Sequence, residues 1–204
     1  MKNIAIIGSG SWGVALGIHL AKLGNNVKMW SFNSEEADLI NNEKKCKFLP
    51  GVTLPDRIIA TTSFEDAIKN SEIILHVTPS KFTRETIKKY EQYVTNQTVV
   101  ICTKGFEKSS LLTLDEVFHE ELPDVKLAAL SGPSHAEEVS RGVPTAIVIA
   151  SEDENTADYV RDIFMNENLR IYTSTDIRGV ELRRSIKKYY CILRWCCSWN
   201  GTRR

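Results

Sequence analysis

NIAIIGSGSWGVALGIHLAKLG, residues 3–24, joins a short β-branched run to an amphipathic segment through three glycines spaced G-x-G-x-x-G. In such a motif Gly8 permits a tight turn, Gly10 lets a pyrophosphate approach the backbone, and Gly13 lets helix and strand pack closely. The start of the helix offers N–H groups and the positive end of its dipole to an anion. We interpret the stretch as a dinucleotide-binding turn; the alternative is a glycine-rich turn without a ligand.

The same alternation of short apolar runs and longer amphipathic segments continues along the chain. Continuous rather than alternating hydrophobicity, as in IAII, IILHV and TVVI, is typical of strands covered on both faces by crossover helices. The sequence therefore predicts a doubly wound, Rossmann-like α/β fold with a mostly parallel sheet. The expected strands are NIAIIG, NVKMW, RIIATT, EIILHV, TVVICT, KLAAL, TAIVIA and LRIYT.

Helix starts are predicted at Ser34, at Ser63 with Asp66 three residues on, and at Ser80. Residues 44–56, KKCKFLPGVTLPD, carry two prolines and a glycine without helical periodicity. We expect this stretch to form a loop between the second helix and the third strand.

Composition narrows the class of protein. The 204 residues include 26 Lys and Arg against 26 Asp and Glu, so no overall charge attracts nucleic acid or an anionic membrane. The chain has no apolar run of membrane-spanning length, and its N-terminus does not resemble a signal peptide, so we expect a cytoplasmic protein. Cys46 and Cys102 lack the spacing of a zinc site. We expect both to be free thiols, with Cys102 buried in a strand, and we expect no metal.

The end of the second expected strand gives no signal for the choice of nucleotide. An acidic residue there commonly binds the adenosine ribose of NAD, and an arginine accommodates the additional phosphate of NADP. Residues 30–33, WSFN, contain neither, so NAD and NADP both stay open. Trp30 or Phe32 lies near adenine in one interpretation and serves only packing in the other.

Four more segments follow expected strands, where the carboxyl edge of such a sheet binds ligands. They are HVTPS (76–80), CTKGFE (102–107), LSGPSHAEEVSRGVPTA (130–146) and GVELRRSIKK (179–188). Together with GSGSWG they resemble, in order and spacing, the bacterial-type NAD(P)-dependent glycerol-3-phosphate dehydrogenases. The resemblance covers residues 1–187.

The resemblance implies reduction of dihydroxyacetone phosphate to sn-glycerol 3-phosphate with NADH or NADPH, which supplies phospholipid synthesis. It also implies an NAD(P)-binding domain over residues 1–178 and the start of a helical substrate domain over residues 179–187. The residues that match the family's cofactor contacts, in addition to the three glycines, are Ser11, Trp12, Lys104 and Ala136. Those that match its substrate contacts are Lys104, Gly132, Ser134 and Lys187, of which Lys187 matches the catalytic, proton-transferring lysine.

Lysines suit this chemistry. Hydride delivered to a ketone carbon leaves negative charge on oxygen, which an ammonium stabilises and protonates. A second ammonium lowers the pKa of the first, and both attract a phosphorylated substrate. Without the resemblance, Lys104 would be interpreted as a solvated turn residue. His135 is an alternative acid that we interpret as a cap or surface residue, while His19 and His76 suggest structural roles.

Residues 188–204 depart from the family, and the departure begins at Arg183 and Arg184, where the family has two glycines. Large side chains there obstruct backbone approach near Lys187. Removing one base near the Lys188 codon permits the adjacent frame to read NIIAFCAGVAAGMG, which suits the family. We therefore interpret the tail as a frameshifted translation that ends early, so that this chain is an incomplete and impaired form. The mass of the natural protein tests this interpretation.

Two other functions stay open. One is a catalytically silent NAD(P)-binding module, and the other is a dehydrogenase of β-hydroxyacids, because related enzymes share the sheet and the glycine turn. The expected partner is a small phosphorylated substrate rather than nucleic acid or a membrane. A homodimer is also considered, since a shortened helical domain leaves apolar surface exposed.

Overall fold

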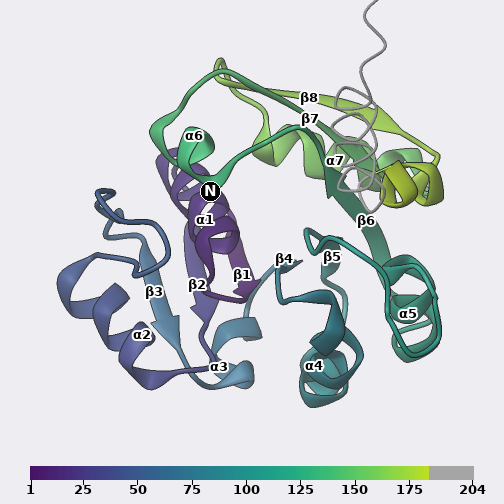
Figure 1. Ribbon diagram of the computed structural model, residues 1–204, viewed down its shortest axis with the longest axis horizontal. Helices are drawn as coiled ribbons and strands as arrows, with labels where there is room; N and C mark the ends of the chain where they lie inside the picture. The colour runs from purple at the N-terminus through teal and green to yellow at the C-terminus, as the bar shows by residue number, and fades with distance from the viewer. Residues whose placement is uncertain (184–204) are drawn as a thin grey trace, which may run out of the picture.

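The computed structural model describes residues 1–183, which form one eight-stranded sheet flanked by helices (Figure 1). The strand order is β3-β2-β1-β4-β5-β6-β7-β8, and every neighbouring pair is parallel except β6 and β7. The predicted doubly wound, mostly parallel fold is confirmed. The strands are β1 (Asn3–Ile7), β2 (Asn26–Trp30), β3 (Ile58–Thr61), β4 (Ile73–His76), β5 (Thr98–Ile101), β6 (Lys126–Ser131), β7 (Thr145–Ala150) and β8 (Leu169–Ser174).

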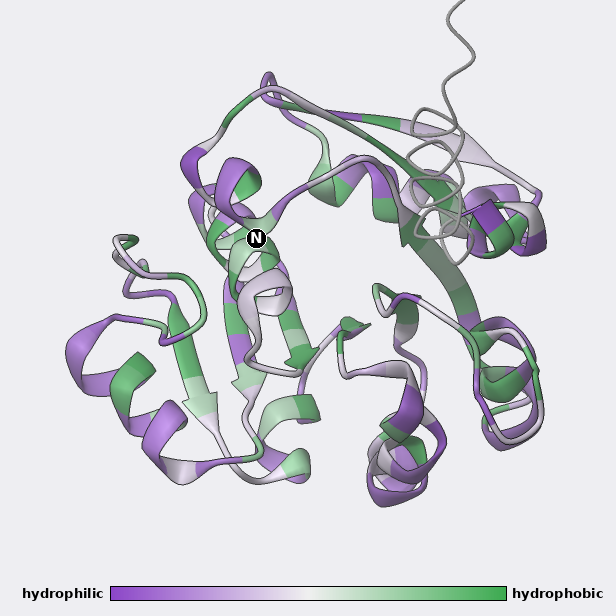
Figure 2. Ribbon diagram, viewed as in Figure 1, coloured by the Kyte–Doolittle hydropathy of each residue, from purple (hydrophilic) through white to green (hydrophobic). Residues whose placement is uncertain are grey.

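Helices cover both faces of the sheet because successive side chains of a strand point to opposite faces. From β1, Ile4 and Ile6 join a core that includes residues of α1, α6 and α7, whereas Ala5 and Ile7 join one that includes residues of α3, α4 and α5. Figure 2 shows the apolar residues concentrated along the strands and the inner helix faces. The helices are α1 (Ser11–Lys22), α2 (Ser34–Asp38), α3 (Phe64–Ile68), α4 (Thr83–Tyr90), α5 (Leu114–Glu121), α6 (Ala136–Arg141) and α7 (Glu154–Phe164).

The observed helix caps agree only partly with those predicted from the sequence. Ser63 caps α3, its hydroxyl accepting a hydrogen bond from the N–H three residues on, as predicted. Ser34 is wrong as a cap, because the side chain of Asn33 accepts the N–H at the start of α2. Ser80 is wrong as well, since it opens a short 3-10 turn, Ser80–Phe82, and α4 begins only after that turn.

Two further expectations concern loops and buried residues. The predicted loop at residues 44–56 is free of helix and strand. Cys102 is buried directly after β5, one residue beyond the strand in which it was expected. Among residues 1–183, none of the helices combines the length and apolar character that a membrane span needs. Lys187 and the tail at residues 188–204 lie outside the described residues.

A fully buried histidine connects the sheet to α4. His76 ends β4, with its Nδ1 3.2 Å from the Tyr90 hydroxyl and its Nε2 2.7 Å from the Thr78 hydroxyl. Its ring lies at 82° to the ring of Phe118, with centroids 5.1 Å apart. Burial lowers the pKa of His76 to about 3, so the imidazole is neutral in the folded protein. His76 thus has the structural role that its apolar sequence context suggested.

We predict that His76 makes folding pH-dependent. The unfolded chain binds a proton on this residue near its ordinary pKa of about 6.5, whereas the folded chain does so only near 3. Its contribution to stability is therefore complete above about pH 6.5 and declines as the pH falls, by up to about 1.4 kcal/mol per pH unit. Urea denaturation of the chain at pH 7.5, 6.5 and 5.5 measures this slope.

The variant His76→Gln should show a shallower slope than the wild type over this pH range. His135→Gln serves as the control, because it alters an exposed imidazole. Equal slopes for the wild type and His76→Gln would contradict the prediction.

Candidate functional site

The glycine turn between β1 and α1 is held by main-chain contacts. Gly8 adopts a φ of 127°, which favours glycine, and its N–H donates to the carbonyl oxygen of Trp30 at 3.1 Å. A Cβ atom on Gly8 would lie 3.1 Å from the carbonyl group of Val77 at the end of β4. A Cβ atom on Gly13 would collide with the carbonyl oxygen of Gly8. These two glycines therefore let α1 approach the ends of three adjacent strands, β1, β2 and β4.

Gly10 differs from the other two glycines because it faces open space. No atom lies within 4 Å of the position that a Cβ would take, and its φ of −68° suits any residue. It is the N-cap of α1, and no side chain caps this helix end. Ser11 follows as the first, half-exposed residue of α1. The turn thus combines an accessible backbone with the positive end of a 12-residue helix, an arrangement suited to an anion.

The side chains of Lys104 and Trp12 lie close together at this turn although they are far apart in the sequence. Lys104 is exposed in the loop that follows β5, and Trp12 lies half-buried in the first turn of α1. The Lys104 Nζ atom is 5.6 Å from the centre of the Trp12 ring. The fold therefore brings a cation from the TKG segment to the glycine turn.

Thr103 fixes the strand end that carries Lys104. Its hydroxyl lies 3.2 Å from the carbonyl oxygen of His76 and 2.7 Å from that of Thr78, and it donates to these two acceptors. The HVTPS and TKG segments are in this way joined by a buried hydrogen-bond network at the carboxyl ends of β4 and β5.

The far side of the Lys104 loop is fixed by an ion pair that the sequence did not reveal. Arg84 of α4 donates from Nε and Nη2 to the two carboxylate oxygens of Glu107, each at 2.9 Å. The Arg84 guanidinium is the main cause of the lowered pKa of Glu107, and Glu107 also accepts a bond from Ser110. A bidentate pair of this kind restrains Glu107, which lies in the same loop as Lys104.

Lys104 and the SGP segment, residues 131–133, line one cavity with a volume of about 260 Å³. Gly132 permits this arrangement, because a Cβ there would lie 2.8 Å from the Ile147 Cγ2 atom of β7. Arg183 also borders the cavity. The lining residues are Lys104, Ser131, Gly132, Pro133, Val148, Val180 and Arg183.

The remaining predicted residues of this segment lie outside that lining. Ser134 is 5% exposed, and its hydroxyl has no hydrogen-bond partner among the described residues. Ala136 is buried as the first residue of α6, which packs beside α1. His135 is the N-cap position of α6 without a side-chain bond, so its exposed imidazole lies at the surface.

Glu181 has a structural role in the GVEL segment, residues 179–182. The carboxylate is 3% exposed and accepts hydrogen bonds from the N–H groups of Leu114 and Asp115, at 2.9 and 3.1 Å. It therefore caps α5 from a separate helical stretch, residues 177–183. This contact attaches the stretch that leads toward Lys187 to the sheet domain.

A second cavity of about 630 Å³ lies at the carboxyl ends of β2 and β4, beside α4. Trp30 packs against Phe64, with centroids 4.2 Å apart and planes 13° from parallel, and also lines the cavity. Phe32 is 85% exposed at its border. Trp30 thus fits both interpretations given above, because it packs against a neighbouring ring and also lines a cavity large enough for a ligand. The lining residues are Trp30, Phe32, Thr78, Pro79, Phe82, Glu85, Thr86 and Lys89.

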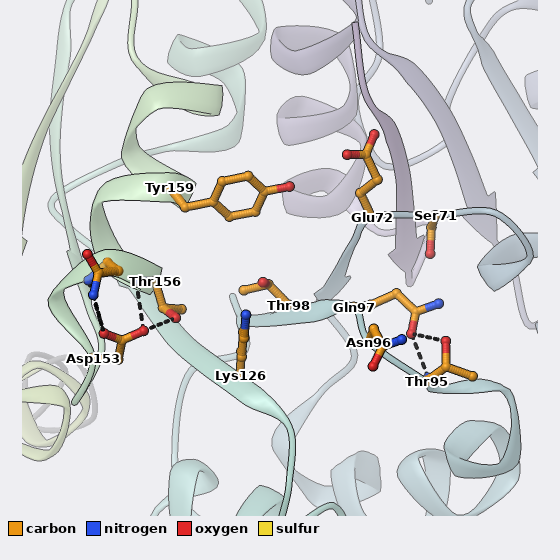
Figure 3. Close-up of a pocket in the computed structure, with 11 residues that line it drawn as sticks. Ser71, Glu72, Thr95, Asn96, Gln97, Thr98, Lys126, Asp153, Thr156 and Tyr159 are labelled. Carbon is orange, nitrogen blue, oxygen red and sulfur yellow. Dashed lines mark hydrogen bonds between the residues drawn. The ribbon is translucent and has the colours of Figure 1, made fainter.

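A polar cavity of about 400 Å³ at the opposite, amino-terminal edge of the sheet contains none of the predicted site residues (Figure 3). Both of its carboxylates are engaged in local contacts: Asp153 caps α7 through Thr156, and Glu72 pairs with Lys2. The predicted site residues within the described part of the chain lie instead at the carboxyl edge, where open α/β sheets bind ligands.

Known proteins resemble this chain in both sequence and fold. A family model described as the N-terminus of NAD-dependent glycerol-3-phosphate dehydrogenase matches residues 3–157. A curated glycerol-3-phosphate dehydrogenase (NAD(P)+) from Agathobacter rectalis is 42% identical over 189 residues, covering 92% of this chain and 56% of the relative. The corresponding protein of Fusobacterium nucleatum is 41% identical, with 92% of this chain and 57% of the relative covered.

Solved structures agree. The glycerol-3-phosphate dehydrogenase of Coxiella burnetii superposes with a TM-score of 0.87 at 34% identity, covering 91% of this chain and 57% of that one. The Plasmodium falciparum structure has a TM-score of 0.84 at 22% identity over 91% of this chain and 56% of that one, which supports the fold alone. The chain spans little more than half the length of these relatives. Because the family model matches most of the chain, the protein belongs to the NAD-dependent glycerol-3-phosphate dehydrogenase family and contains its N-terminal domain.

Proposed function

We propose that this protein serves the NAD(P)-dependent reduction of dihydroxyacetone phosphate to sn-glycerol 3-phosphate, a reaction that supplies phospholipid synthesis. The observation that carries the proposal is the meeting of the glycine turn, Lys104 and Gly132 at one edge of the sheet. Family membership and the relatives' names, glycerol-3-phosphate dehydrogenase (NAD(P)+), support the same activity.

The turn fits a dinucleotide. The space beside Gly10 is open, so a pyrophosphate can approach the backbone there and accept hydrogen bonds from the uncapped start of α1. Ser11 and Trp12 belong to the same helix turn, and Lys104 adds a positive charge beside the Trp12 ring. In this proposal the cofactor contacts are Gly8, Gly10, Ser11, Trp12, Gly13, Lys104 and Ala136.

The cavity bordered by Lys104 and Gly132 is proposed to receive the phosphorylated substrate. Lys104 attracts the anion, and the backbone at Gly132 lines the cavity. The buried hydroxyl of Ser134, two residues on and outside the lining, is the other proposed substrate contact of this segment. When bound, the reduced nicotinamide supplies the hydride. Lys187, outside the described residues, is proposed to donate the proton to the substrate oxygen.

The proposed organisation follows from these roles. Residues 1–178 form the NAD(P)-binding domain, residues 179–187 begin the substrate domain, and residues 188–204 are a frameshifted tail. We further propose a cytoplasmic protein whose partners are small molecules rather than nucleic acid, and which associates into a homodimer.

We predict opposite effects for two glycines of the turn. Gly10→Val should change the free energy of unfolding by no more than about 1 kcal/mol, because the new side chain meets open space. It should weaken NADH binding at least roughly tenfold, since it occupies the pyrophosphate position. Calorimetric titration with NADH and urea denaturation measure the two quantities.

Gly13→Val is the matched control for this test. It should destabilise the fold by about 1–3 kcal/mol, because the added atoms collide with the Gly8 carbonyl group. Unchanged NADH affinity in a folded Gly10→Val protein would contradict the proposed binding turn.

Turnover is tested by following oxidation of NADH and NADPH with dihydroxyacetone phosphate or with a β-keto acid. We expect turnover of dihydroxyacetone phosphate by a version in which the family's reading frame continues after Lys187, and little or none by the 204-residue chain. Lys104→Met in the frame-restored version should lower kcat/KM for this substrate at least roughly a hundredfold, since a charge-assisted contact is lost.

Each other outcome identifies a different function. Cofactor binding without turnover in either version would support a catalytically silent module. Activity with the β-keto acid alone would support a β-hydroxyacid dehydrogenase, and equal activity of Lys104→Met and its parent would exclude Lys104 from the substrate site.

A further inference from the structure

A carboxylate lies at the glycine turn although residues 30–33 contain none. The Glu36 Oε2 atom accepts a hydrogen bond from the Ser9 hydroxyl at 2.8 Å and lies 3.2 Å from the Ser31 hydroxyl. The two hydroxyl oxygens are themselves 2.9 Å apart. Ser9 is the residue between Gly8 and Gly10, and Ser31 follows the last residue of β2. The three side chains therefore connect the turn after β1 with the end of β2.

The local fold explains how Glu36 reaches this position. Ser31 is completely buried, whereas the neighbouring Trp30 and Phe32 line the cavity beside α4, so the chain alternates at the end of β2. Asn33 then caps α2, and Glu36 falls in the first turn of that helix. Its half-buried side chain points back to the buried Ser31 and to the turn.

This location is the one in which dinucleotide-binding folds distinguish their two nucleotides. A carboxylate there hydrogen-bonds the hydroxyl groups of the adenosine ribose of NAD, whereas an arginine accommodates the 2′-phosphate of NADP. The spacing from the glycines differs here, because the carboxylate comes from the helix after β2 instead of the strand end. The residues at the end of β2 therefore give no sign of this carboxylate.

The charges of the neighbouring cavity favour the same choice. Within the described part of the chain, Lys89 is the one cation that lines the cavity of about 630 Å³. Its Nζ atom is held by the Glu85 carboxylate at 2.6 Å. A 2′-phosphate would bring roughly two negative charges toward Glu36 without meeting an arginine in that lining.

We propose that Glu36, positioned by Ser9 and Ser31, binds the adenosine ribose hydroxyls and excludes a 2′-phosphate, so that the protein binds NADH in preference to NADPH. This inference rests on the proposed dinucleotide-binding function and specifies the nucleotide that the site accepts. Glu36 acts on selectivity and takes no part in hydride or proton transfer.

The test is calorimetric titration of the 204-residue chain and two variants with NADH and with NADPH at fixed ionic strength. The wild type should bind NADH at least roughly tenfold more tightly than NADPH, an effect expected of one adjacent like charge. Glu36→Gln keeps an oxygen that accepts the serine hydrogen bonds but removes the charge. It should lower that preference by roughly tenfold or more, chiefly by strengthening NADPH binding.

Glu35→Gln is the matched control, because Glu35 is an exposed carboxylate on the same helix turn. It should leave the NADH-to-NADPH preference unchanged. Equal affinities of the wild type for the two nucleotides, or an unchanged preference in Glu36→Gln, would overturn the inference while the proposed function stands. No binding of either nucleotide by the folded wild type would overturn the proposed function itself. The wild-type comparison decides the inference even where Glu36→Gln fails to fold.

Discussion

The close approach of α1 to the end of β1 is the constraint on which the arrangement of this site depends. Gly13 faces the Gly8 carbonyl oxygen, and Gly8 faces the main chain at the end of β4, so neither position has room for a side chain. The helix start is consequently fixed against the sheet while Gly10 stays open to solvent. Rigid placement and an accessible backbone are separate requirements, and different glycines satisfy them.

The groups beyond the turn are positioned through strand ends rather than through long loops. Thr103 bonds the main chain at the end of β4, so the loop with Lys104 begins from a fixed point. The Arg84–Glu107 pair fixes the same loop farther along, and its bidentate geometry restricts rotation as well as distance. Pre-positioning of this kind lowers the entropy that an exposed lysine loses when it binds an anion.

The eight strands and their two-sided burial were predictable, because continuous apolar runs and glycine spacing are local signals. The glycine turn was predictable for the same reason. Asn33 and Glu36 were missed since their roles depend on the path of the chain after β2. Glu181, which caps a helix far away in the sequence, and the ion pair of Arg84 are non-local contacts that no short motif reveals.

Positive and negative side chains occupy different parts of the carboxyl edge of the sheet. Lys104 and Arg183 border the cavity near the SGP segment, whereas Glu36 lies between the turn and the end of β2. The proposed function places the pyrophosphate at the start of α1, between Ser9, which bonds Glu36, and Trp12, whose ring centre lies 5.6 Å from the Lys104 Nζ atom. Under the proposed function the cationic region attracts a phosphorylated substrate, and under the inference drawn for Glu36 the anionic region opposes a 2′-phosphate on the adenosine ribose. In this proposal, opposite charges at the two regions let the same edge of the sheet accept phosphate at one location and reject it at another.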